Sequence, residues 1–365
     1  MSRTWTTRRR TAVYVTALGA AVAVAGCGSD NGAAGNAATT ATAGCANGTL
    51  AGGGSTFQLN VEQQWAADFS QQCSGAKVNY TGVGSGAGIQ QFGAGTIDFA
   101  GSDVAMVDSE QSAADKRCGG KAVTFPVTAG GVAIIYNVDG VKGLKLSADT
   151  LAGIFQGTIK RWDDPAIKAE NPDASLPDTP VVTYHRADGS GTTAVFSAFE
   201  DAAAPHAWKL GSDKQLNWPG GQGATGSDGV VQGVKSTNGG ITYAEVSYAT
   251  ANNLPTASVK GASGDYVQLT ADTVSQAIDT GFSPTGPGAD VVGPIDVTKL
   301  TGYPLSTVSY AIVCQKYDDS GTAELVKDYL GYALAGGQTG VTALGYAPLP
   351  DSVTSAAKTA LESVS

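Results

Sequence analysis

The sequence predicts an α/β protein built of two lobes, and three observations support this fold class. Apolar strand-like runs alternate with helical stretches along most of the chain, which is typical of largely parallel sheets. Behind an N-terminal export segment, about 339 residues remain, too many for one ordinary core. Turns rich in glycine, serine and threonine follow several of the strands, at the sheet edge where such folds bind ligands.

Residues 1–26 are predicted to be a lipoprotein signal peptide. Four arginines and no acidic residue precede the uncharged run TAVYVTALGAAVAVAG, which ends directly before Cys27. This run of about 16 residues is shorter than the roughly 20 that a membrane span needs. Because a cysteine behind small residues is typical of bacterial lipoproteins, we expect Cys27 to become the acylated, palmitate-bearing first residue. An ordinary signal peptide is the alternative, and general and twin-arginine export both remain open.

The small, polar residues 27–46 offer nothing to build a core and are predicted to be a flexible tether. We therefore expect a protein that is lipid-anchored on the extracytoplasmic face of the cell membrane. Without the four signal arginines, 18 basic side chains stand against 32 acidic ones, a net charge of about −14. Such a chain argues against nucleic acid and anionic lipid as partners, whereas a buried site for a small anion depends on its local donors.

Four cysteines remain behind Cys27, and an even number outside the cytoplasm favours two disulfides, for which three connectivities exist. Cys45 precedes a predicted strand and Cys73 ends the helix that follows it, so we favour this pair, with Cys118 and Cys314 as the other. None of their spacings matches the short spacing of metal sites, and we expect no metal and no cofactor.

Strands and helices alternate from residue 46 onward. The predicted strands lie at 46–57, 76–83, 96–103, 122–138, 180–186, at the start of 239–253, and at 308–316. The predicted helices lie at 59–73, 88–95, 147–157, 164–172, 192–202, at the end of 239–253, and at 322–336. Trp65 and Phe69 share one face of the first helix, and Leu325, Tyr329 and Tyr332 form one stripe on the last.

Three strand-to-helix turns combine glycine with hydroxyl residues: GGGSTF at 52–57, GSGAG at 84–88 and DGSGTT at 188–193. A helix N-terminus has unpaired backbone N–H groups and a partial positive charge, glycine lets a ligand approach it, and a hydroxyl adds a donor. Any one turn is explained as well by helix capping. Three together, with Arg186 beside the third, favour a site for a tetrahedral oxyanion.

Other chemistries fit these turns less well. None contains the Gly-Lys-Ser/Thr of a nucleotide P-loop, and none contains the Gly-x-Ser-x-Gly of a serine hydrolase. Residues 82–87 match a dinucleotide pattern with an acid, Asp103, about 20 residues further on, but the pattern is weak in a chain with 50 glycines. Only His185 and His206 could act as a general base, and we interpret His185 as a structural neighbour of Arg186. The sequence thus favours binding without catalysis.

Taken together, these segments resemble the periplasmic-type phosphate-binding lipoproteins that serve bacterial phosphate ABC importers. The resemblance covers almost the whole mature chain and rests on these segments, in the order of the family: AGGGSTF, VNYTGVGSGAGIQQF, TIDFAGSDVAM, FPVTAGGVAIIYNV, TIKRWDDPAI, RADGSGTT, GSDGVVQGV and GGITYAEVSYA. It implies a periplasmic-binding-protein fold of two α/β lobes, joined by crossover hinge strands, with the ligand in the cleft between them.

The resemblance also implies a set of phosphate-binding residues. Asp103 would accept a hydrogen bond from the ligand's proton, Arg186 would pair with the phosphate, and Asp188 would hold that arginine. The full set is Thr56, Phe57, Ser85, Asp103, Arg186, Asp188, Ser190, Gly191 and Thr192. The sequence departs from the family pattern at Gln58, where a proline is common, and at Gly86, which replaces a small hydroxyl residue of some relatives.

A carboxylate in an anion site discriminates between oxyanions. Phosphate near neutral pH still carries a proton and can donate a hydrogen bond, whereas fully ionised sulfate can only accept one. Facing sulfate, a buried Asp103 carboxylate would stay unpaired, at a cost of about 1–3 kcal/mol or more. Sites that depend on such a hydrogen bond can reject the wrong ligand by a factor of about 10⁴–10⁵.

We therefore expect a monomer that binds one inorganic phosphate and delivers it to a membrane permease. The first lobe is predicted at 47–127 and 304–365 and the second at 128–303, with FPVTAGG and TGYPLST as crossovers. A phosphate-sensing lipoprotein and an extracellular phosphatase on a similar scaffold are the alternatives.

Overall fold

The computed structural model describes residues 44–284, 290–293, 295–297 and 299–365. The predicted signal peptide, Cys27 and most of the predicted tether lie outside the described residues. Within the described part of the chain, no helix combines the length and the apolar character that a membrane crossing requires.

One eight-stranded sheet forms the frame of the protein, in the order β2-β1-β3-β11-β4-β8-β6-β7. Its strands are β1 Gly48–Gly54, β2 Ala76–Gly82, β3 Phe99–Ser102, β4 Ala122–Asn137, β6 Val182–Arg186, β7 Gln222–Ala224, β8 Gly240–Glu245 and β11 Ser306–Cys314. A small second sheet contains β5 Lys145–Leu146, β9 Ser258–Lys260 and β10 Tyr266–Val267. We call β1, β2 and β3 with their helices the first half, and β6, β7 and β8 with theirs the second half.

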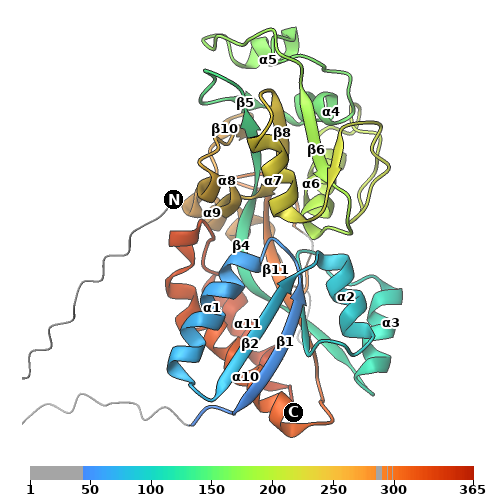
Figure 1. The fold of residues 1–365 in the computed structure, drawn as a ribbon, viewed down its shortest axis with the longest axis vertical. Helices are drawn as coiled ribbons and strands as arrows, with labels where there is room; N and C mark the ends of the chain where they lie inside the picture. The colour runs from blue at the N-terminus through green and yellow to red at the C-terminus, as the bar shows by residue number, and fades with distance from the viewer. Residues whose placement is uncertain (1–43, 285–289, 294, 298) are drawn as a thin grey trace, which may run out of the picture. The chain divides into compact units, whose positions relative to one another are not determined.

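The expected parallel pairing holds inside each half but not at the centre of the sheet. β1 pairs in parallel with β2 and β3, and β6 pairs in parallel with β7 and β8. The two central strands, β4 and β11, instead run antiparallel to each other and to β8 and β3, respectively. β4 is the long strand that passes from one half to the other in Figure 1: its first part pairs with β11 and its last part with β8.

A β-bulge interrupts the pairing of β4 with β11 at the middle of the sheet. Ser309 pairs with Thr128 and Tyr310 pairs with Pro126, so Val127 is an extra residue in β4. Proline cannot donate to a ladder and is tolerated at such irregularities. The bulge therefore resets the register of β11 at Ser309, whose side chain reaches the candidate site described below.

The α-helices lie on both faces of the sheet. They are α1 Leu59–Gln72, α2 Ser85–Gly93, α3 Asp108–Arg117, α4 Ala148–Phe155, α5 Pro165–Glu170, α6 Gly191–Ala203, α7 Gly226–Lys235, α8 Val246–Asn252, α9 Ala271–Gly281, α10 Ser320–Ala333 and α11 Asp351–Glu362. In the first half α1, α10 and α11 pack together on one side and α2 and α3 on the other; in the second half, α7 packs with α8, and α4 with α6. Two 3₁₀ helices, Gly336–Thr339 and Val341–Leu344, follow α10.

The predicted apolar stripes are buried, except that Tyr332 is only partly buried. Trp65 and Phe69 of α1 are almost fully buried, and the ring of Phe69 packs edge-on against Tyr329 of α10 at 5.4 Å. Helix α3, in contrast, was not predicted, because its sequence DSEQSAADKR is polar all round and has only one buried residue, Ala114. The helices α7, α9 and α11 were not predicted either, although each buries an apolar face, so the predictions missed helices that cover the core as well as one at its rim.

Both favoured disulfides are confirmed. Cys45 is bonded to Cys73, which ties the start of β1 to the end of α1. Cys118 is bonded to Cys314 across 196 residues of sequence and ties the end of α3 to the end of β11. The second bond thus connects two segments from opposite ends of the chain.

The Cys118→Ser/Cys314→Ser double variant should unfold at a lower temperature than the unaltered chain. Removing a native disulfide typically costs about 2–5 kcal/mol, and the chain-entropy account predicts a larger loss for longer loops. Thermal melts followed by circular dichroism measure this, with Cys45→Ser/Cys73→Ser as the shorter-loop comparison. A double variant that melts with the unaltered chain would show that the long-range bond adds nothing to stability.

A buried glutamate ends β8. Glu245 is fully buried, and one of its carboxylate oxygens accepts hydrogen bonds from the backbone N–H and the hydroxyl of Ser247 at the start of α8. Burial raises the pKa of Glu245 to about 8, although the hydrogen bonds from Ser247 oppose the shift. The folded chain therefore holds this carboxyl protonated at pH values where the unfolded chain has already released the proton.

This raised pKa predicts how the free energy of unfolding depends on pH. The contribution of Glu245 is fully present below its ordinary pKa near 4.5 and is lost as the pH rises to about 8. Glu245→Gln keeps an acceptor for Ser247 and removes the titratable group. The melting temperature of this variant should therefore fall less between pH 5 and pH 9 than that of the unaltered chain. Melting curves at one-unit pH intervals test this, with the exposed Glu324→Gln as control. Parallel pH profiles for the unaltered and Glu245→Gln chains would contradict the prediction.

Candidate functional site

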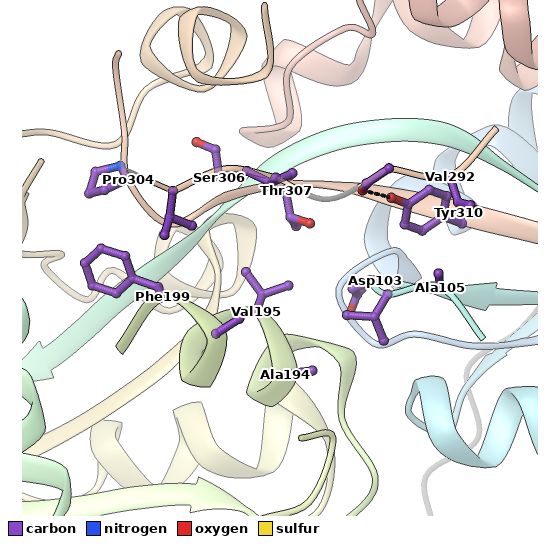
Figure 2. A pocket seen from close by; sticks show the side chains of 15 residues that line it. Asp103, Ala105, Ala194, Val195, Phe199, Val292, Pro304, Ser306, Thr307 and Tyr310 are labelled. Atoms are coloured by element: carbon purple, nitrogen blue, oxygen red, sulfur yellow. Dashed lines mark hydrogen bonds between the residues drawn. The ribbon is translucent and has the colours of Figure 1, made fainter. Parts of the chain in front are cut away.

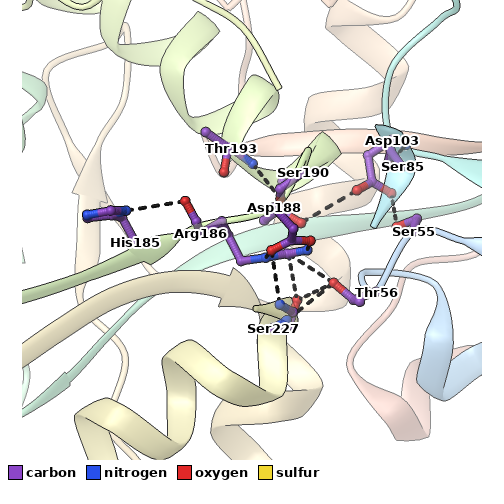
Figure 3. A network of polar contacts seen from close by, with 12 residues as sticks. Ser55, Thr56, Ser85, Asp103, His185, Arg186, Asp188, Ser190, Thr193 and Ser227 are labelled. Carbon is purple, nitrogen blue, oxygen red and sulfur yellow. Dashed lines mark hydrogen bonds and ion pairs between the residues drawn. The ribbon is translucent and has the colours of Figure 1, made fainter. Parts of the chain in front are cut away.

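The candidate site lies where strands from both halves end. β1, β2 and β3 end at the turns that carry Thr56, Ser85 and Asp103, and β6 ends at Arg186. Parallel strands place their carboxyl ends at one edge of a sheet, and the helices that follow point their N-termini at the same place. The structure thus brings the three glycine-rich turns and Asp103 together, as Figure 3 shows.

The first turn contributes a hydroxyl from Thr56. This residue is 4% exposed, and its Oγ1 accepts a hydrogen bond from Nη1 of Arg186 at 2.9 Å. Phe57 follows directly, but its ring packs edge-on against Tyr346 at 5.9 Å and is fully buried in the core. Of the two predicted residues here, Thr56 thus reaches the site through its side chain, whereas Phe57 can reach it through its backbone alone.

The second turn is shaped by close approach of the third. Gly84 precedes α2 with a φ of +88°, and a Cβ on it would lie 2.5 Å from Oδ2 of Asp188. The backbone N–H of Gly86 donates to the carbonyl oxygen of Gly189 at 2.9 Å. Glycine at 84 and 86 therefore lets the two halves touch.

Asp103 is the acceptor in this cluster. It is 2% exposed, and its Oδ1 accepts hydrogen bonds from the hydroxyls of Ser55 and Ser309, both at 2.5 Å. Its Oδ2 points toward the N-terminus of α6, where the Thr192 hydroxyl lies at 3.5 Å. Burial raises the pKa of Asp103 above its ordinary value, against the hydrogen bonds from Ser309 and Ser55 and the charge of Arg186. One oxygen is thus saturated by donors and the other faces the second half.

Arg186 and Asp188 form a buried ion pair that places the arginine. Nε of Arg186 donates to Oδ1 of Asp188 at 2.7 Å, and Nη2 donates to Oδ2. Burial alone would raise the pKa of Asp188, but the hydrogen bonds and charge of Arg186 hold it below its ordinary value. Two parallel contacts fix the plane of the guanidinium, and Nη1 is left directed at Thr56 of the first half.

The third turn leads into α6, whose first residues are fully or almost fully buried. The side chain of Ser190 caps the helix by accepting from the backbone N–H of Thr193 at 3.1 Å. Gly191 lies so close to Asp103 that a Cβ on it would be 2.6 Å from Oδ2. Glycine is therefore required at 191, and Thr192 stands beside it with its hydroxyl toward Asp103.

A fourth turn, which the sequence analysis did not include in the site, completes the cluster. Ser227 at the start of α7 is fully buried, and its hydroxyl lies 2.8 Å from that of Thr56. Its neighbour Gly226 donates its backbone N–H to Oδ1 of Asp188 at 3.0 Å. The Gly-Ser pair at a strand-to-helix turn is the same local signal as in the other turns, so Ser227 could have been found from the sequence.

Ser55, Ser309 and Gln58 were missed for different reasons. Ser55 stands in the first turn, next to the predicted residues. Ser309 lies in the apolar strand β11, and only the fold brings it within reach of Asp103. The sequence analysis noted Gln58 only as a departure from the family pattern; it is fully buried and donates from its side chain to Ser309 at 2.7 Å.

His185 is held by contacts with neighbouring residues. Its ring stacks on Trp218 with centroids 4.9 Å apart, and its Nδ1 lies 3.2 Å from the carbonyl oxygen of Arg186. Burial lowers the pKa of His185. In the part of the chain that the structure describes, no group of three or more acidic, histidine or cysteine residues is arranged to hold a metal ion.

An apolar cavity of about 410 Å³ adjoins the cluster and shares Asp103 with it. It is lined by residues of α6 such as Val195 and Phe199, by Tyr310 of β11 and by Val292, with Asp103 at one side (Figure 2). These walls offer few hydrogen-bond donors. An anion is therefore better served by the polar cluster, where the strand-to-helix turns, their hydroxyls and a guanidinium converge.

Comparison with known proteins places the chain in a family. Residues 39–336 match the model of the PBP superfamily domain. The phosphate-binding protein PstS 3 of Mycobacterium tuberculosis is 41% identical over 363 residues, which cover 97% of this chain and 98% of that protein.

Solved structures share the fold. A high-affinity periplasmic phosphate-binding protein solved with bound phosphate has a TM-score of 0.70 at 24% identity, covering 86% of this chain and 93% of its own. A protein from Clostridium perfringens assigned to a phosphate ABC transporter, also solved with phosphate, has a TM-score of 0.60 at 19% identity, covering 83% and 100%. The chain belongs to the phosphate-binding protein family within the PBP superfamily.

Proposed function

We propose that this chain captures one inorganic phosphate outside the cytoplasm and delivers it to the permease of a phosphate ABC importer. The observation that carries the proposal is the position of Asp103, a buried carboxylate with one oxygen facing a cluster of donors. Its Oδ2 is directed at the N-terminus of α6, while Oδ1 is already occupied by Ser55 and Ser309. A ligand between the two halves must therefore accept from most groups and donate to one.

Phosphate has this combination near neutral pH. Its oxygens would accept from the Arg186 guanidinium, from hydroxyls such as Thr56 and Thr192, and from backbone N–H groups at the turns. Its remaining proton would be donated to Oδ2 of Asp103. Asp188 would act on the ligand indirectly, because both of its oxygens hold Arg186. The proposed binding residues are Thr56, Phe57 through its backbone, Ser85, Asp103, Arg186, Asp188, Ser190, Gly191 and Thr192.

We infer binding and release without a chemical step. The ring of His185 is engaged with Trp218 and with the carbonyl oxygen of Arg186, so it does not stand beside a serine of the cluster as a base would. The relatives are named as binding proteins.

The proposed lobes are residues 47–127 with 304–365, and residues 128–303. Their boundaries would lie within β4 and just before β11, the two strands that join the halves of the sheet. Across the boundary between these proposed lobes, Arg186 contacts Thr56 and Gly86 contacts Gly189, as we would expect for lobes that close around phosphate.

Isothermal titration at pH 7 tests the ligand and the role of Asp103. The purified chain should bind phosphate at one site per chain and bind sulfate at least 10³-fold more weakly. Asp103→Asn should lower the phosphate-over-sulfate ratio by at least tenfold, because an amide can donate to sulfate. Asp201→Asn, which removes an exposed charge from the same protein, is the control. Equal affinities for phosphate and sulfate in the unaltered chain would refute the proposal.

Cys27→Ser should release the protein from the membrane. We propose that a lipid on Cys27 holds the chain at the extracytoplasmic face, and the variant lacks the thiol that the lipid requires. Fractionation of cells that express the full chain should find the unaltered protein with the membranes and the variant in the soluble extracytoplasmic fraction. Equal membrane association of both would show that Cys27 is not the anchor.

A further inference from the structure

Gln58 is connected to Asp103 by two hydrogen-bonded hydroxyls. It stands between the Thr56-Phe57 turn and α1 and is fully buried. Its backbone N–H donates to Oγ of Ser55 at 3.3 Å, and its side-chain Nε2 donates to Oγ of Ser309 at 2.7 Å. Both of these hydroxyls are the groups that contact Oδ1 of Asp103 at 2.5 Å. Gln58 thus lies behind both donors of the carboxylate.

The direction of these hydrogen bonds follows from the partners of the amide. Nε2 of Gln58 also lies 2.8 Å from the carbonyl oxygen of Tyr310, which can only accept. The nitrogen must therefore be at this position, and it donates to Ser309 as well. Since the Ser309 oxygen then accepts from Gln58, its single hydrogen is free to point at Asp103.

The Ser309 hydroxyl also has a second acceptor within reach. Its oxygen lies 3.2 Å from the carbonyl oxygen of Ser102, an acceptor that competes with Asp103. The amide lies in space that only a glycine at 101 leaves open, because a Cβ there would lie 2.3 Å from Oε1 of Gln58. The glycine at 101 leaves the space that the glutamine side chain occupies.

We propose that Gln58 is a positioning residue that directs the Ser309 hydroxyl at Asp103 and thereby keeps Asp103 an acceptor for the proton of bound phosphate. The inference rests on the proposed function and adds a selectivity determinant that does not touch the ligand. Donation from Ser309 and Ser55 stabilises the ionised carboxylate and opposes the effect of burial on its pKa. If one donor turns away, Asp103 takes up a proton more readily. A protonated Asp103 donates instead of accepting, which suits sulfate and no longer favours phosphate.

Gln58→Met tests the inference, because methionine fills a similar volume and has no donor. The phosphate-over-sulfate affinity ratio at pH 7 should fall about 3- to 10-fold, the effect of one hydrogen bond. The pH below which that ratio declines should also move upward, a shift that a loss of packing alone would not produce. Titration calorimetry with phosphate and with sulfate from pH 5 to pH 8 measures both.

Two further variants separate positioning from stability. Ser309→Ala should have the same effect, and Gln58→Met added to Ser309→Ala should cause no further change in the ratio, because both act through one hydroxyl. Gln156→Met is the control: its Nε2 at the end of α4 also donates to two acceptors, the carbonyl oxygens of Ala152 and Ala207, both in the second half. It should lower the melting temperature and leave the ratio and its pH profile unchanged.

The outcomes distinguish the inference from the proposed function. The unaltered chain could prefer phosphate while Gln58→Met leaves the phosphate-over-sulfate ratio and its pH profile unchanged. That result would overturn the role of Gln58 and leave the proposed phosphate binding intact. Additive effects of Gln58→Met and Ser309→Ala would also overturn it. An unaltered chain that does not prefer phosphate would overturn both the function and the inference.

Discussion

The burial of the Asp103 carboxyl group is the constraint on which the rest of the site depends. An ionised carboxylate removed from water must find donors, since an unpaired buried charge costs several kcal/mol. Ser55 supplies one donor from the turn after β1, and Ser309 supplies the other from β11. The end of β3 must therefore lie beside the centre of β11, and the bulge opposite Ser309 sets the register there. The strand that joins the two halves thus also defines the electrostatics of the site.

The second carboxylate, Asp188, has a different role from Asp103, because it holds the arginine. It is engaged through both oxygens by Arg186 and by the backbone N–H of Gly226, so it balances the charge of the guanidinium and fixes its plane. With the arginine neutralised in this way, a bound anion would be held mainly by directed N–H and O–H groups at helix N-termini. This arrangement agrees with the acidic character of the chain, because recognition then depends on local geometry and not on an attractive overall field.

Local patterns in the sequence were sufficient for much of the fold and of the site. Glycine with serine or threonine between a strand and a helix marks a helix N-terminus, and three such turns converge as predicted, with Ser227 as a fourth of the same kind. Ser309 could not be predicted in this way, because its role arises from a strand pairing 206 residues away in sequence from Asp103. Gln58 is a related case: its two long-range partners, Ser309 and Tyr310, belong to the same distant strand. The antiparallel pairing at the centre of the sheet was not predicted for the same reason. It depends on which segments meet and not on the periodicity of their sequences.

The contacts between the two halves differ chemically from the contact that would discriminate between phosphate and sulfate. Gly86 donates to Gly189 through the backbone, Thr56 meets Ser227 through hydroxyls, and Lys214 forms an ion pair with Glu110. None of these groups would accept a proton from a ligand, so under the proposed function they would act alike on any anion that fits. Discrimination between anions would then depend on Asp103, which belongs to the first half and accepts hydrogen bonds there from Ser55 and Ser309. A ligand that cannot donate would leave Oδ2 of Asp103 beside an anion with no hydrogen between them, although Oδ1 keeps its donors Ser55 and Ser309. If the halves close around phosphate as proposed, the contacts between them would form favourably only with a ligand that makes this one hydrogen bond, so a few non-selective contacts could serve a selective site.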